Sequence, residues 1–366
     1  MKNINFRNII DDALFPLMRE RCVMLNLPYY PNPGDCMIWM GMEQFMHRHG
    51  IECIYRSSAD TFMYRPLTDD VVICFVGGGN FGDLWNEEEQ LVCKVSQLYP
   101  KNRIVVFPQS VHYCDEKRLL SESAILSLHS DLHICAREKA SYKLLNLHFS
   151  QNNILLVPDM ALYLHFSHVP SVNEKRNLLF LKREDKEAVD YNCWSINNAD
   201  ITDWPMMDLT KINAQNNNFS NRIRHWFLRH SGQFIKEKNI ILIYRLYSIK
   251  FLKTIENKSC PIDERWLNVL AELWYVEYLA KNKTTNFIML LDWFAYNFFM
   301  PIQVQYAAQY INQYKRVITT RLHGGILAFV LKKDVDFIDN SYGKISAVVD
   351  LWLSNFTNVR MLKENE

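Results

Sequence analysis

Residues 317–331 read VITTRLHGGILAFVL, and this stretch decides the fold. It begins as a β-branched strand, passes through Arg-x-His-Gly-Gly, and continues as an apolar run with helical spacing. A second strand-like segment, DVDFIDN at 334–340, follows directly. Strand, helix and strand in this order predict a βαβ unit, in which both strands lie parallel in one sheet.

The rest of the chain repeats this pattern. Strand-like apolar runs lie at 22–27, 51–55, 70–76, 103–108, 131–136, 153–158, 177–185 and 316–320. Helix-like segments lie between several of them, at 36–49, 84–98, 115–128 and 138–147. The pattern predicts the α/β class, with parallel sheets covered by helices on both faces.

The organisation of the chain is expected to be bipartite. A polar stretch near residue 170 suggests one domain over 1–170 and a second over 171–345, with 346–366 as a C-terminal helix or tail. Ligands of parallel sheets lie beyond the carboxyl ends of the strands. The candidate functional loops are therefore the segments that follow strands, at 28–35, 77–83, 108–113, 137–138 and 158–159.

Composition excludes several classes of protein. A formal net charge of +1 over 366 residues gives no support for nucleic-acid binding. The nine cysteines are scattered without a CxxC pair, and no signal peptide opens the sequence, so a reducing cytoplasm is expected. No apolar run approaches the roughly 18–20 residues that a membrane span requires.

The opening motif carries chemistry as well as fold. Arg321 offers a planar guanidinium suited to a carboxylate or phosphate, and His323 can give or take a proton near neutral pH. Gly324 and Gly325 would leave the helix N-terminal amides open to an oxyanion. A purely structural histidine at the strand end is the alternative interpretation.

A second glycine-rich stretch, VGGGNFGDLW at 76–85, follows a strand. Its Gly78, Gly79, Asn80 and Asp83 are expected to contact an anion or a sugar, at a turn that opens a helix. The alternative is a tight turn that packs the helix on the sheet. The stretch lacks the spacing of a dinucleotide-binding fingerprint and the Lys-Ser/Thr pair of a phosphate loop.

Further charged residues follow other strands. Lys344 in DNSYGKI is a candidate phosphate partner, and Asp35 in NPGD is either the N-cap of its helix or a base for a hydroxyl. Arg137 in CAREKASYKLL is either solvated or in contact with a ligand, and Arg183 in FLKRED also follows a strand, as does Asp159 in VPDMAL.

No metal site is expected, because the sequence has no HExxH and no His/Cys cluster at ligand spacing.

Taken in order, these motifs resemble the polysaccharide pyruvyl transferase family. The stretches that carry the resemblance are NPGD, VGGGNFGDLW, VVFPQSVHY, CAREKASYKLL, ILLVPDMAL, LKRED, TTRLHGGILAFVL and DNSYGKI. They cover most of residues 20–185 and 315–352, and the resemblance is silent over much of 205–300. It implies two facing Rossmann-like domains, similar to GT-B glycosyltransferases, with the active site in the cleft between them.

The resemblance also implies a reaction. Members transfer the enolpyruvyl unit of phosphoenolpyruvate onto a sugar of a cell-envelope glycan, commonly as a cyclic ketal, and this scheme needs no cofactor. Arg321 and His323 would form the core of the donor site, His323 as the acid, while Asp35 or Asp83 would act as base for the acceptor. Where many members have a Gly-x-Gly-Pro-like stretch, this chain has PQSVHY, so Gln109 and His112 are expected to line the acceptor pocket.

Two alternatives stay open at this point. One is a nucleotide-sugar-dependent glycosyltransferase on the same fold, and the other is a non-catalytic glycan-binding member of an envelope assembly complex. For the pyruvyl transferase, the expected partners are phosphoenolpyruvate and a glycan or lipid-linked oligosaccharide. The latter would be met at the inner face of the membrane.

Overall fold

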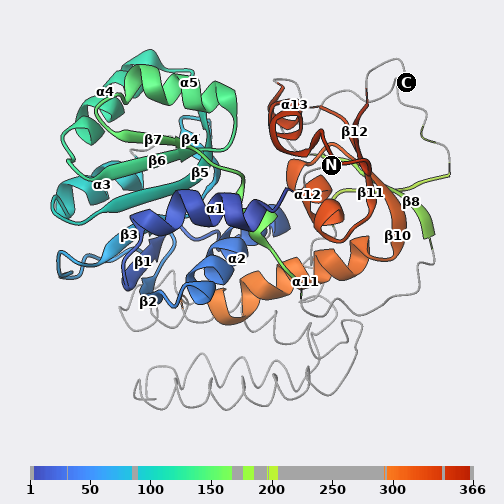
Figure 1. Cartoon of the computed structure of the whole chain (residues 1–366), viewed down its shortest axis with the longest axis horizontal. Helices are drawn as coiled ribbons and strands as arrows, with labels where there is room; N and C mark the ends of the chain where they lie inside the picture. Colours follow the sequence, from blue (N-terminus) through green and yellow to red (C-terminus); the bar gives the residue numbers. More distant parts are fainter. Residues whose placement is uncertain are drawn as a thin grey trace, which may run out of the picture. The chain divides into compact units, whose positions relative to one another are not determined.

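A computed structural model describes residues 4–30, 32–84, 90–166, 176–184, 196, 198–204, 292, 295–339 and 343–362 (Figure 1). By its internal contacts the chain divides into two units, one of residues 1–205 with 303–366 and one of residues 206–302. The first unit carries both sheets and every residue of the candidate site described below. The predicted boundary at residue 170 lies outside the described residues and stays a prediction.

The first sheet, sheet A, contains seven strands, and all its pairings are parallel. Its strands are β1 (Arg21–Leu25), β2 (Glu52–Arg56), β3 (Val72–Phe75), β4 (Gly78–Gly82), β5 (Ile104–His112), β6 (Leu132–Ala136) and β7 (Asn153–Leu156). They follow the order β2-β1-β3-β5-β6-β7, with β4 beside the end of β5. Six of the seven correspond to predicted apolar runs, and β4 does not.

Sheet B contains five strands, again with parallel pairings. They are β8 (Arg176–Leu181), β9 (Asp200–Thr202), β10 (Tyr314–Thr319), β11 (Asp334–Phe337) and β12 (Val359–Met361), in the order β12-β11-β10-β8-β9. The two parallel sheets confirm the predicted α/β class with Rossmann-like halves. Each sheet changes winding direction once, between β1 and β3 in sheet A and between β8 and β10 in sheet B, and ligands favour such switch points.

The helices follow the predicted alternation. Those around sheet A are α1 (Phe6–Leu14), α2 (Pro33–Arg48), α3 (Leu91–Leu98), α4 (Glu116–Ser127) and α5 (Lys139–His148), with short helical turns η1 (Phe15–Leu17) and η2 (Met160–Tyr163). The later elements are η3 (Ala295–Phe299), α11 (Met300–Ile311), α12 (Leu322–Val330), α13 (Lys344–Val348) and η4 (Val349–Leu353). The helix predicted from residue 84 begins at Leu91, and residues 85–89 lie outside the described part of the chain.

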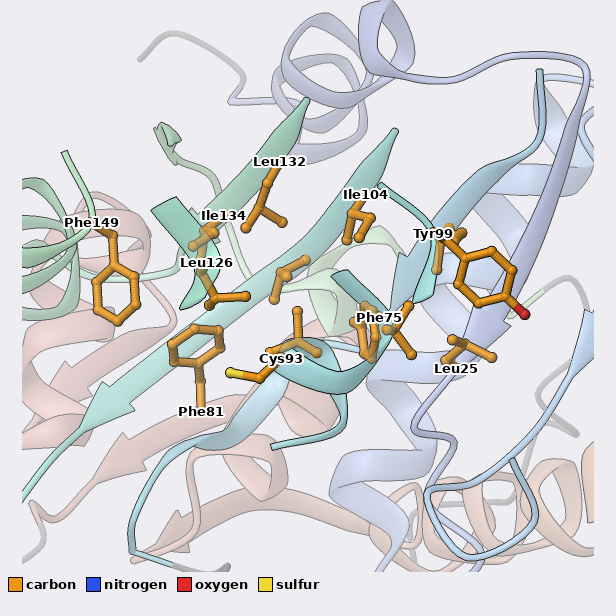
Figure 2. Close-up of a cluster of buried hydrophobic side chains, with 14 of the residues drawn as sticks. Leu25, Phe75, Phe81, Cys93, Tyr99, Ile104, Leu126, Leu132, Ile134 and Phe149 are labelled. Carbon is orange, nitrogen blue, oxygen red and sulfur yellow. The ribbon is translucent and has the colours of Figure 1, made fainter. Parts of the chain in front are cut away.

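The core of sheet A shows why its strands are apolar throughout. Successive side chains point to opposite faces of a strand, and in β5 Ile104 and Val106 belong to the cluster of Figure 2, together with Phe81, Leu126 and Phe149. Phe107 lies instead against Phe45 of α2. Both faces of the sheet are therefore covered, as in other parallel sheets.

Among the residues that the structure describes, no helix combines the length and apolar character needed to cross a membrane.

Candidate functional site

Arg137 stands at the centre of a charged cluster and comes directly after strand β6. Its side chain is only 1% exposed, yet it carries a permanent charge. Nε donates to Ser110 Oγ at 2.9 Å, and Nη1 donates to Asp159 Oδ2 at 2.6 Å. Nη2 makes no hydrogen bond within the described residues. A buried guanidinium with a donor group to spare is suited to an anionic ligand.

Asp159 is the fixed negative charge of this cluster. It follows β7, is fully buried, and caps η2 by accepting the Ala161 amide at 2.8 Å. Burial by itself would raise the pKa of this carboxyl, but His323, Arg137 and the Ala161 amide together hold the pKa well below its usual range. Asp159 is therefore an ionised acceptor for both Arg137 and His323.

His323 reaches the cluster from the first turn of α12, the helix that follows β10 of sheet B. Its Nε2 lies 3.2 Å from Asp159 Oδ2 and 3.5 Å from Arg137 Nη1. Its other nitrogen, Nδ1, faces Gly34, where an added Cβ would stand only 2.8 Å away. Because the carboxylate holds Nε2–H, Nδ1 is the nitrogen left to exchange a proton with a ligand.

Lys344, the first residue of α13, also comes from the sheet B side. Its Nζ would lie 2.8 Å from a Cβ added at Gly79, and Arg137 Nη2 would lie 3.7 Å from the same point. The preceding Gly343 adopts φ 75°, a left-handed conformation that glycine accepts without strain. Two cationic groups, one from each sheet, therefore approach Gly79.

The N-terminus of α2 adds a polar group beside this cluster. Its cap is Asn32, whose side chain accepts from the Gly34 amide, so the prediction that Asp35 caps the helix is wrong. Asp35 instead accepts from Asn32 Nδ2 at 2.7 Å and from the Tyr30 hydroxyl at 2.9 Å. Asn80 reaches the same hydroxyl at 3.4 Å.

The backbone of β4 completes this surface. A Cβ added at Gly78 would lie 3.8 Å from Asp35 Oδ1, so the start of β4 lies next to the start of α2. The stretch was predicted as a turn that opens a helix, and the structure corrects this, because Gly78–Gly82 forms a strand that pairs with β5. Because Gly79 has no side chain, Lys344 and Arg137 can approach the main chain of β4 at that position.

Arg321 precedes α12 as its N-cap and has a different main partner. Its Nη2 donates to Asp203 Oδ2 at 2.7 Å and its Nε to Asp203 Oδ1, a two-pronged ion pair. Arg183 follows β8, and its backbone amide donates to Thr320 Oγ1 at 2.7 Å. Arg137 is the arginine whose guanidinium lies within 3.5 Å of His323.

Gly324 and Gly325 allow close packing, and the expectation of an open amide is wrong for Gly325. A Cβ at Gly324 would stand 2.3 Å from Leu181, and one at Gly325 would stand 2.0 Å from the ring of Phe337. The amide of Gly325 donates to the carbonyl of Arg321 within the helix. These glycines let α12 approach the sheet closely and so set the position of His323.

Gln109 and His112 lie in β5, although the sequence suggested a loop after residue 108. Gln109 is buried, and its Nε2 donates to the Val76 carbonyl at 2.7 Å, so it braces the neighbouring strand. His112 ends β5 and lies near Asp83 and Cys114, whose ligand-type atoms are all within 4.8 Å of one another. This group is distinct from the cluster around Arg137.

Two features of the site were not identified from sequence. Asp159 was noted only as a residue after a strand, because nothing in VPDMAL shows that it meets a histidine 164 positions away. Trp352 was not noted, yet its indole Nε1 donates to the Arg137 carbonyl at 2.8 Å and joins η4 to the end of β6. The signal available for Asp159 was its place after a buried strand.

Comparison with known proteins agrees with this picture. The family model of polysaccharide pyruvyl transferases matches residues 32–342. EpsO of Bacillus subtilis (strain 168), whose name describes it as a pyruvyl transferase, is 30% identical to this chain. The alignment covers 94% of this chain and 89% of EpsO. Pyruvyl transferase 1 of Schizosaccharomyces pombe is 25% identical over 63% of this chain and 62% of its own.

A solved structure shares the fold. It is a protein of uncharacterised function from Klebsiella pneumoniae, 18% identical, with a TM-score of 0.53 over 98% of this chain and 99% of its own. The family match spans most of the chain, including α2, β4, Arg137, Asp159 and His323. The chain belongs to the polysaccharide pyruvyl transferase family, and is a pyruvyl transferase that acts on polysaccharide.

Proposed function

We propose that this pyruvyl transferase takes its pyruvyl group from phosphoenolpyruvate and joins it to two hydroxyls of a sugar as a cyclic ketal, with release of phosphate. The observation that carries the proposal is the approach of Arg137 Nη2 and Lys344 Nζ to Gly79, beside His323. A buried arginine and a lysine that converge on one point suit a small anion with more than one negative charge.

Phosphoenolpyruvate matches this charge. It carries a carboxylate and a phosphate on neighbouring atoms, so one ligand can engage a planar guanidinium and an ammonium together. The N-terminus of α2, with Gly34 at its second position, adds the positive end of a helix dipole near the same point. The missing side chain at Gly34 leaves room for the His323 ring, and the one at Gly79 leaves room for the Lys344 ammonium.

His323 supplies the proton that the reaction requires. Its Nδ1 protonates the methylene carbon of phosphoenolpyruvate, which becomes a methyl group while C2 gains oxocarbenium character. One sugar hydroxyl forms a bond to C2 and loses its proton, then the bond from C2 to the phosphate oxygen breaks. The second hydroxyl closes the ketal and loses its proton, and hydrogen phosphate leaves. Acid catalysis of this kind contributes about 10²–10⁴-fold in rate.

The acceptor sugar is placed by the polar group of α2 and β4. Asp35 acts as the base for a sugar hydroxyl, oriented by its hydrogen bonds from Asn32 and Tyr30. Tyr30 is 41% exposed and offers a ring face to a sugar, while Asn80 offers an amide. In this assignment acid and base come from opposite sheets.

The proposal includes a cytoplasmic location with a lipid-linked acceptor at the inner face of the membrane. All seven cysteines that the structure describes are free thiols, as expected in a reducing compartment. Cell fractionation tests this part separately: recovery with extracellular or periplasmic proteins would contradict it, whatever the donor.

The donor is tested by the thermal stability of the purified protein with phosphoenolpyruvate and, separately, with a panel of nucleotide sugars. A ligand at 100 times its dissociation constant stabilises the folded state by about 2.7 kcal/mol. We expect a shift with phosphoenolpyruvate alone. A shift with a nucleotide sugar alone would identify a glycosyltransferase, and a shift with neither, in a protein that binds glycan, would identify a binding protein.

A further inference from the structure

A second group of ligand-type side chains lies at the carboxyl ends of β4 and β5. His112 Nδ1 lies 3.7 Å from Asp83 Oδ1 and 3.8 Å from Cys114 Sγ. All three candidate ligand atoms lie within 4.8 Å of one another. Asp83 of this group comes four residues after Gly79 in the chain, which corresponds to roughly 13 Å at the usual rise of a strand. The pyruvyl transfer proposed above does not use it.

The arrangement is not that of a catalytic relay. In a Cys-His-Asp relay the acid contacts one ring nitrogen and the thiol contacts the other. Here the thiol and the carboxylate both approach the same nitrogen, Nδ1 of His112. Three donor atoms that converge on one point are instead the arrangement of a metal-ligand set.

The spacing fits a tetrahedral ion. Zinc binds sulfur at about 2.3 Å and histidine nitrogen or carboxylate oxygen at about 2.0–2.2 Å, so neighbouring ligands in a tetrahedral site with one sulfur lie about 3.3–3.7 Å apart. The separations of His112 Nδ1 from Asp83 Oδ1 and from Cys114 Sγ, 3.7 and 3.8 Å, exceed this spacing by a few tenths of an ångström or less. An ion would need only small movements of the side chains.

The backbone holds the carboxylate in place. Gly82 pairs with His112 at φ 116°, and a Cβ there would stand 1.7 Å from the His112 carbonyl, so glycine brings Asp83 up to the end of β5. The amides of Cys114 and Asp115 then donate to the Asp83 carboxylate at 2.6–2.9 Å. Such outer hydrogen bonds fix the direction in which a metal ligand points.

We propose that Asp83, His112 and Cys114 form a zinc site with one open coordination position. A thiolate, an imidazole and a carboxylate together favour zinc over magnesium or calcium, which prefer oxygen ligands. Cys114 is exposed and the His112 side chain is 43% exposed, so solvent or a ligand oxygen can reach the fourth position. This proposal replaces the sequence expectation that the chain has no metal site.

The test uses cobalt(II) as a coloured substitute for zinc on the full-length protein. A thiolate bound to cobalt gives a charge-transfer absorption in the near ultraviolet, which oxygen and nitrogen ligands alone do not give. We expect this band to appear on titration and to disappear when an equivalent of zinc is added. Because the thiol must ionise to bind, zinc binding should also release a proton.

Three variants assign the band to these residues. Cys114→Ser should abolish it, and His112→Ala and Asp83→Asn should weaken cobalt binding at least tenfold. The matched control is Cys53→Ser, at a half-buried thiol that donates to the Tyr55 carbonyl. No thiolate band in the wild-type protein, or a band that persists in Cys114→Ser, would overturn the proposal. Circular dichroism of each variant establishes that it is folded.

Discussion

Sheet A and sheet B wind in the same way, with the chain moving out to one edge and then returning to build the other side. They differ in what their strand ends contribute. Sheet A supplies Arg137 and Asp159, which are fully buried and form an ion pair, and the pKa of the Asp159 carboxyl is held well below its usual range. Sheet B supplies His323 and Lys344 from the first turns of two helices. A buried ion pair thus comes from one sheet, and the side chains that begin helices come from the other.

This difference has a physical reason. A side chain directly after a buried strand is enclosed by neighbouring strands and helices, so its charge must be paired within the protein. A side chain in the first turn of a helix extends beyond the sheet, where a ligand can reach it. The comparison therefore predicts that variants of the sheet A residues mainly affect stability, and variants of the sheet B residues mainly affect turnover.

The largest expected effect is that of Arg137→Met. Removing the guanidinium leaves Asp159 buried with fewer partners, and breaking a buried pair in this way costs about 3–5 kcal/mol. Chemical denaturation measures this loss. The double variant Arg137→Met/Asp159→Leu should recover much of the stability while staying inactive. A single variant as stable as the wild type would remove the distinction between the two sheets.

His323→Gln is the matching change on the sheet B side. We expect pyruvyl transfer to fall by about 10²–10⁴-fold because the acid is lost. The midpoint of thermal unfolding should move far less than in Arg137→Met. Phosphate release from phosphoenolpyruvate in the presence of the acceptor measures the first quantity. Unchanged turnover would show that His323 is structural.

A smaller effect is expected from Gly34→Ala, which acts on His323 from the side of sheet A. The new methyl would stand 2.8–3.0 Å from the imidazole ring, so the ring must move, and displacement of a catalytic group by about 1 Å can cost 10²-fold in rate. Comparison of kcat in the two proteins measures this.

The control for Gly34→Ala is Gly50→Ala, just beyond the other end of the same helix. Gly50 has φ 66° with no atom within 4 Å of an added Cβ. This change should cost about 1–2 kcal/mol of stability through backbone strain and leave kcat unaltered. Equal loss of kcat in both variants would mean that the helix as a whole, rather than contact with His323, is responsible.

The smallest expected effect is the contribution of Asp159 to the pH dependence of the free energy of unfolding near neutral pH. Its folded pKa is depressed, so its stabilising contribution is fully present above the unfolded value, near pH 3.9, and is lost as the pH falls through the lower folded value. We therefore expect no contribution from this group to the pH dependence of unfolding between about pH 7 and about pH 5.

The free energy of unfolding of Asp159→Asn should not show the loss in strong acid that the wild-type protein shows when Asp159 becomes protonated. The exposed Asp70, whose pKa is lowered to about 2 by Thr68 and Arg21, provides a comparison at the surface. A wild-type protein that loses stability through Asp159 already near pH 6 would contradict the ionised state assigned here.

Much of the fold could be predicted from sequence, for reasons visible in particular strands. Residues 72–75 and 132–136 are buried on both faces and read as continuous apolar runs. Strand β4 could not be predicted, because three of its five residues are glycine, which has no side chain to signal a face.

The site was predictable in part. Arg137, His323 and Lys344 could be singled out because they follow strands or begin helices, where the ligands of parallel sheets lie. Two partners were not predicted. Arg321 was expected beside His323, but in the structure it pairs with Asp203. Asp35 was offered as the cap of α2, but in the structure the cap is Asn32. Both depend on which short polar side chain reaches a given partner, and spacing along the chain does not determine that.

The central claim is that Arg137 and Lys344 hold the donor anion at Gly79, and that Arg321 does not. Titration calorimetry with phosphoenolpyruvate tests it directly, on the wild-type protein, Lys344→Met, Arg321→Met and the surface control Lys315→Met. We predict that Lys344→Met weakens binding at least tenfold, or about 1.4 kcal/mol, while Arg321→Met and Lys315→Met stay close to wild type. Loss of binding in Arg321→Met with full affinity in Lys344→Met would contradict the account.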